Sequence, residues 1–65
     1  MGYVLTKKFL EAYEEERVMA VITSHTRNGK KPTIQEIADE LFADPDIIQE
    51  VITGLINQGK IQEVS

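Results

Sequence analysis

The sequence predicts a small, mainly α domain in which three helices are followed by a short C-terminal strand. Three breaks, each containing Gly, Pro or Asn, divide the chain at residues 28–32, 43–45 and 57–59. Apolar residues recur at helical spacing before and between these breaks, and polar and apolar residues alternate after the last one. A chain of 65 residues has room for one hydrophobic core. We therefore interpret residues 1–65 as a single domain.

The first helix is expected over about residues 6–26, with Thr6 as its N-cap. One apolar stripe in its C-terminal half is formed by Val18, Val21, Ile22 and His25. A second apolar group, Phe9, Leu10 and Tyr13, lies on another side of the helix, because each residue turns the helix by about 100°. Two interpretations remain open: the helix breaks near residues 14–16, or its N-terminal half packs against something else, such as a second subunit.

The second helix is expected over about residues 33–42 and the third over about 45–58. Thr33 and Glu36 fit a capping box, in which each side chain accepts a hydrogen bond from the other residue's backbone N–H. Asp44 before Pro45 suits an N-cap followed by the first helical position. The residues expected to face the core are Ile34, Ile37, Ala38 and Leu41 in the second helix and Ile48, Val51, Ile52 and Leu55 in the third.

The end of the chain predicts the start of a wing. Gly59 suits the left-handed residue that ends a helix, and residues 60–64 alternate in polarity, so we expect a strand there. Two short helices joined by a short turn cross steeply, as in the helix-turn-helix unit. The sequence therefore predicts a helix-turn-helix, winged-helix-like domain. The alternative is a three-helix bundle with a free tail.

From Val18 onward, about three quarters of the chain resembles the N-terminal DNA-binding domain of the SOS repressor LexA and related winged-helix repressors. The matching segments are residues 18–22 with His25, residues 32–41, Pro45, Leu55 and residues 59–65. The moderately specific part is Pro32-Thr33 followed by Glu36-Ile37-Ala38. The turn between the second and third helices departs from the family pattern because it lacks a glycine.

The resemblance implies that the third helix enters the major groove of double-stranded DNA and that its first turns contact base edges. Gln49 suits adenine, which it can contact through two hydrogen bonds, and Glu50 suits the amino group of cytosine. The basic residues before the second helix suit phosphate contacts. The residues expected to bind nucleic acid are Arg27, Lys30, Lys31, Thr33, Gln35, Asp46, Gln49, Glu50, Thr53 and Lys60.

The charge distribution is unfavourable for strong DNA binding, so we also consider binding to a partner protein or a second copy. The net charge is −4, and residues 33–58 contain six acids and no Lys or Arg, whereas phosphate contacts supply much of the affinity in DNA complexes. Ile47 is expected to be exposed, and the third helix is more apolar than one core face requires. We therefore also predict a partner interface, for another protein or a second copy of the chain, formed by Phe9, Leu10, Tyr13, Ile47 and Ile56.

Several other functions find no support in the sequence. There is no cysteine, and a single histidine cannot complete a metal site, so no metal or other cofactor is expected. His25 is expected to interact with the negative end of the first helix. No nucleophile–base pair and no phosphate-binding glycine loop is present, so we expect no enzymatic activity. No apolar run approaches the roughly 18 residues of a membrane span, and the lack of cysteine suits a cytoplasmic location.

Two functions remain at this point. The first is a small DNA-binding transcriptional regulator, expected to be a homodimer, with the third helix contacting bases and the basic loop contacting phosphates. The second is a winged-helix-like protein-interaction module that uses the acidic, partly apolar third helix and does not bind DNA.

Overall fold

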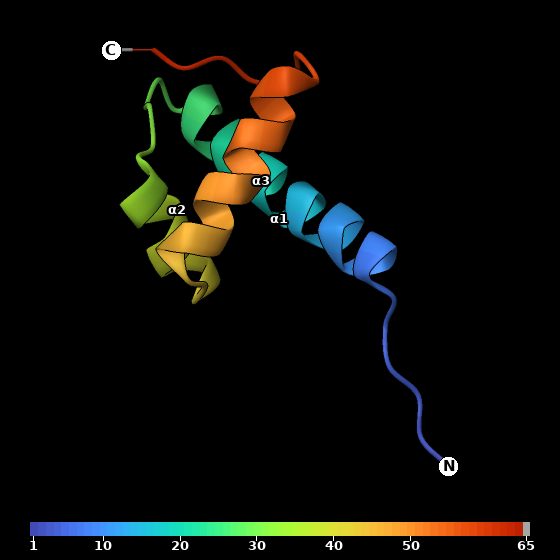
Figure 1. Ribbon diagram of the computed structural model, residues 1–65. Helices are drawn as coiled ribbons and strands as arrows, with labels where there is room; N and C mark the ends of the chain where they lie inside the picture. Colours follow the sequence, from blue (N-terminus) through green and yellow to red (C-terminus); the bar gives the residue numbers. More distant parts are fainter. Residues whose placement is uncertain (65) are drawn as a thin grey trace.

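The computed structural model describes residues 1–64, which form three α-helices: α1 (Lys7–Arg27), α2 (Ile34–Leu41) and α3 (Pro45–Asn57) (Figure 1). The prediction of a mainly α chain is confirmed, and each helix end lies within a residue or two of the predicted position. The first helix is continuous through residues 14–16, so the proposed break there was wrong. Its N-terminal half projects beyond α2 and α3 (Figure 1).

The helices begin where the sequence supplies a side-chain acceptor for their first free N–H groups. The Thr6 hydroxyl accepts from the backbone N–H of Phe9 at 3.3 Å. Thr33 and Glu36 form the predicted capping box, and Asp44 accepts from the backbone N–H of Asp46 at 2.8 Å. Each contact satisfies a donor that no helical carbonyl can reach.

The predicted strand over residues 60–64 does not form, and residues 1–64 contain no strand at all. Gly59 does adopt the expected left-handed conformation, with φ of 74°. The backbone N–H of Lys60 then donates to the Leu55 carbonyl at 3.0 Å, which closes the end of α3. A strand needs a neighbouring backbone to pair with, and the tail finds none; it is anchored instead through the half-buried Ile61.

The core is small and draws on all three helices. Val18 of α1, Ile37 of α2 and Ile48 and Leu55 of α3 are at most 1% exposed. Val21 and Ala38 complete the buried set. In contrast, every residue from 1 to 13 is exposed. The folded body is therefore built by the C-terminal half of α1 together with α2 and α3.

The turn between α2 and α3, residues 42–44, contains the one residue other than glycine with positive φ among those described. Phe42 has φ of 53° and ψ of 41°, and its backbone N–H reaches back to the last carbonyls of α2. The Ala43 N–H donates to the Ala38 carbonyl at 2.9 Å. A left-handed residue at this position reverses the chain sharply, which is why α3 can fold back against α2.

Replacing Phe42 by glycine is predicted to stabilise the fold by about 1 kcal/mol, because a Cβ atom is strained in the left-handed region and glycine is not. The Phe42 side chain is 98% exposed, so its removal forfeits no burial. The matched control is Phe42→Ala, which keeps the Cβ and should change stability little. Urea denaturation followed by circular dichroism measures both, and equal stability changes for the two variants would contradict the strain.

Leu55→Ala is predicted to cost about 3 kcal/mol, because it leaves a cavity among residues from three helices. A domain of this size has only a few kcal/mol of stability in total, so the variant should be largely unfolded. Ile47→Ala in the same helix is the control, since Ile47 is 49% exposed, and it should retain the native spectrum. A folded Leu55→Ala protein would show that the core is not where the structure has it.

Candidate functional site

A concavity of about 570 Å³ lies between the end of α1, the start of α2, one side of α3 and the tail. Its apolar lining includes six isoleucines, Ile22, Ile34, Ile37, Ile52, Ile56 and Ile61. Its polar rim includes Lys30, Lys31, Thr33, Gln35 and Gln49. These five rim residues all belong to the set expected to bind nucleic acid, so the fold gathers half of that set around one feature.

The remaining five residues of that set lie elsewhere. Asp46, Glu50 and Thr53 are exposed on α3 without lining the concavity, and Arg27 is exposed at the last residue of α1. Lys60 lines a second, shallower hollow together with Glu15 and Glu16 of α1. Lys60 thus lies apart from the basic loop, in a hollow that two acids also line.

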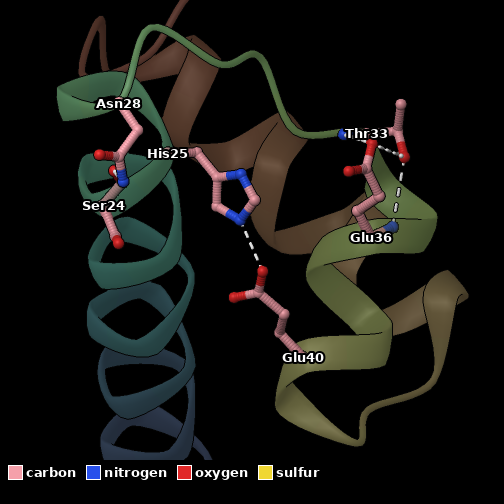
Figure 2. A network of polar contacts seen from close by, with 6 residues as sticks. All are labelled: Ser24, His25, Asn28, Thr33, Glu36 and Glu40. Atoms are coloured by element: carbon pink, nitrogen blue, oxygen red, sulfur yellow. Dashed lines mark hydrogen bonds and ion pairs between the residues drawn. The ribbon is translucent and has the colours of Figure 1, made fainter.

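The position of Lys30 and Lys31 is set by the way α1 ends. The Asn28 side chain donates to the Ser24 carbonyl at 3.1 Å (Figure 2). Gly29 has φ of 71°, and the Lys30 N–H donates to the His25 carbonyl at 2.8 Å. These bonds satisfy carbonyls that the helix leaves without partners. Both lysine side chains are exposed at the rim.

The start of α2 already carries its own negative charge. The Glu36 carboxylate accepts from the Thr33 backbone N–H at 3.2 Å and from the Thr33 hydroxyl at 3.1 Å (Figure 2). Next to it, the Gln35 amide donates to the Asp39 carboxylate at 2.8 Å. An anion approaching this helix start therefore meets a carboxylate, and the favourable charge on this side comes from Lys30 and Lys31.

The side of α3 that is turned away from the core presents amide, hydroxyl and carboxylate groups. The Thr53 hydroxyl donates to the Gln49 carbonyl at 2.9 Å, and the Gln49 amide lies 3.4 Å from the Thr53 hydroxyl. No other side chain in residues 1–64 holds the Gln49 amide. Gln49 is therefore available for a ligand at the boundary between the concavity and the outer side of α3.

Two polar contacts that hold the helices together were not found by sequence reasoning. His25 was expected to interact with the end of its own helix, but its Nε2 lies 2.5 Å from a carboxylate oxygen of Glu40 in α2 (Figure 2). Arg17 forms an ion pair with Glu14 of its own helix at 3.2 Å. It also donates to the Leu41 carbonyl at 2.9 Å, at the end of α2. Neither long-range partner leaves a local signal, because both lie more than a dozen residues away.

The five residues expected to form a partner interface are all exposed, but they do not form one surface. Phe9, Leu10 and Tyr13 are 44–56% exposed on the projecting half of α1. Ile56 is 38% exposed and lines the concavity, which no residue of that projecting half lines. Ile47 lies at the start of α3. These residues are thus divided between separate apolar surfaces, including the concavity and the projecting helix.

Comparisons with protein-family models, with curated proteins and with solved structures gave no significant match. No helix in residues 1–64 combines the length and the apolar composition that crossing a bilayer requires. Within the same residues, no three His, Asp or Glu side chains are grouped so that they could hold a metal ion.

Proposed function

We propose that this protein is a small DNA-binding regulator of the helix-turn-helix, winged-helix-like type. The observation that carries the proposal is the arrangement of α2 and α3: two short helices joined by residues 42–44, with α1 behind them and one polar side of α3 free. Helix-turn-helix units use a connection of similar length to present their second helix to the major groove.

In this proposal α3 enters the groove and Gln49, Glu50 and Thr53 contact base edges. The Gln49 amide can pair with adenine through two hydrogen bonds, and the Glu50 carboxylate can accept from the cytosine amino group. Lys30 and Lys31 lie at the rim of the concavity that Gln49 also lines. The same approach of the duplex would therefore bring these two lysines towards the phosphates.

The charges limit the affinity of this mode. Glu36 and Asp46 occupy the first turns of α2 and α3, where other proteins use free N–H groups to bind phosphate. Phosphate contacts then depend on Arg27, Lys30 and Lys31. Each neutralised phosphate contributes a slope of about −0.9 to the logarithmic dependence of the binding constant on salt. We expect weak binding with a slope of about −3 for each copy.

A second function, a protein-interaction module, is supported by the lining of the concavity. Apart from the buried Ile37, its isoleucines are half-buried or exposed, and Gln62, Glu63 and Val64 of the tail also line the concavity. A partner with an apolar anchor and basic flanks would complement this surface and the acids of α2 and α3. Such a partner would not depend on Lys30 and Lys31.

Titration of the protein into labelled duplex DNA at about 50 mM and about 200 mM salt tests the first function, because binding through three cations should weaken about 40-fold between these conditions. Lys30→Gln combined with Lys31→Gln should remove about two units of the slope. Fluorescence anisotropy measures both quantities.

The matched control is Lys8→Glu, which changes the net charge by the same amount on the projecting half of α1. It should bind as the original protein does. If duplex DNA is not bound even at the lower salt, or if the control loses as much affinity as the double variant, the DNA-binding proposal fails and the protein-interaction function takes its place.

A further inference from the structure

The N-terminal half of α1, residues 7–16 and hereafter the α1 arm, has no partner within the described chain that covers its apolar side. Phe9 is 56%, Leu10 44% and Tyr13 47% exposed. Tyr13 follows Phe9 by four residues and Leu10 by three, so the three side chains lie on one side of the helix. The arm leads away from α2 and α3 (Figure 1).

Such an extension gains little stability in isolation. The rest of α1 already supplies the nucleus of this helix, but the turns of the arm gain no burial of their own, and most helical stability in proteins comes from tertiary packing. The Arg17 guanidinium lies 5.5 Å from the centre of the Tyr13 ring and donates to the Leu41 carbonyl. The apolar side of the arm therefore begins where the folded body ends and continues outward from it.

The charges beside this apolar side fit a second copy of the chain running in the opposite direction. Lys7 and Glu14 are seven residues apart, so they lie on the same edge of the apolar side two turns from each other. When two such helices pair antiparallel, residues of one edge meet residues of the same edge. Lys7 of each copy then lies beside Glu14 of the other, whereas a parallel pair would bring opposite edges together and leave Lys7 and Glu14 of the two copies apart.

We propose that two copies of this chain associate through their α1 arms, packed antiparallel across the side formed by Phe9, Leu10 and Tyr13. Leu10 of each copy lies opposite Tyr13 of the other, and the twofold axis passes between residues 11 and 12. Lys7 is 91% exposed and makes only a 4.0 Å contact with Glu11. It can therefore turn to Glu14 of the second copy, whose carboxylate also accepts from Arg17 at 3.2 Å.

The surface is small, so the dimer is reversible. The arm offers ten residues, to which the exposed Tyr3, Val4 and Leu5 add apolar area. This places the contact below the roughly 1,200 Å² of standard interfaces. A membrane surface is the less suitable occupant, because the arm carries four glutamates against two lysines and anionic lipids repel such a helix.

Sedimentation equilibrium from about 10 µM to about 1 mM protein tests the association over the range in which small interfaces populate dimers. Leu10→Gln combined with Tyr13→Gln should weaken the dimer by at least about tenfold, since it removes the aromatic and aliphatic contacts at its centre. Lys8→Gln combined with Glu11→Gln is the control: it places two glutamines on the same arm away from the apolar side and leaves the net charge unchanged.

The control should retain the dimer, and circular dichroism should show both double variants folded, because all four positions are exposed. A chain that stays monomeric up to about 1 mM overturns the proposal, and so does a dimer that the Leu10 and Tyr13 substitutions leave intact. Binding to anionic vesicles by a chain that never dimerises would assign the arm to a membrane instead.

The orientation is tested separately, because the sequence contains no cysteine. Leu10→Cys and Tyr13→Cys proteins, mixed in equal amounts and oxidised, should form the mixed disulfide in excess of random pairing. Preference for the two homodisulfides would indicate a parallel pair and overturn the antiparallel arrangement. The proposal does not depend on DNA binding, since sedimentation in the absence of DNA measures it directly.

Discussion

The joint burial of four side chains, Val18, Ile37, Ile48 and Leu55, is the constraint on which the rest of the structure depends. They come from all three helices and are at most 1% exposed, and within residues 1–64 only Val21 and Ala38 extend this buried set. A core this small leaves little surplus over the conformational entropy lost on folding. The polar contacts at its border therefore matter more than they would in a larger domain, where many buried residues share the same task.

Those polar contacts fix the orientation of α2 and α3 relative to α1. Arg17 reaches the Leu41 carbonyl at the end of α2, and His25 reaches Glu40 one residue earlier. Both bonds run from α1 to the last turn of α2, next to the left-handed Phe42. The turn that aims α3 is thus held from behind at two positions. A strained residue persists only where its surroundings determine its conformation. Here these two bonds and the core beneath them hold Phe42 in its left-handed conformation.

Local signals were enough to predict the helices but not what lies between them. The helix starts could be predicted from their N-caps, Thr6, Thr33 and Asp44, because a cap contacts backbone groups only a few residues away. The end of α3 could be predicted from Gly59 for the same reason. The prediction of a strand was wrong because the alternation of polar and apolar residues over residues 60–64 indicates only a local preference for extended backbone. A strand also requires a neighbouring backbone to pair with. The concavity itself was not predicted, although half of the residues expected to bind nucleic acid, among them Lys30, Lys31 and Gln49, line it. Lys60 lines a hollow on α1 instead, and this position depends on the path of the chain after Gly59, which no local pattern specifies.

The separation of the two apolar surfaces has a physical consequence for how they can be used. The concavity lies between the C-terminal end of α1, the start of α2, α3 and the tail. The α1 arm is the opposite, N-terminal end of the same helix. A rod of 21 residues is about 30 Å long. An occupant of one surface therefore need not displace an occupant of the other.

If two copies pair through their arms, each α3 and each pair of rim lysines stays free, and the pairing doubles the number of cations available to a phosphate backbone. A domain with net charge −4 and few basic residues gains most from such duplication, because the salt-dependent part of DNA affinity grows with the number of phosphates that are neutralised together.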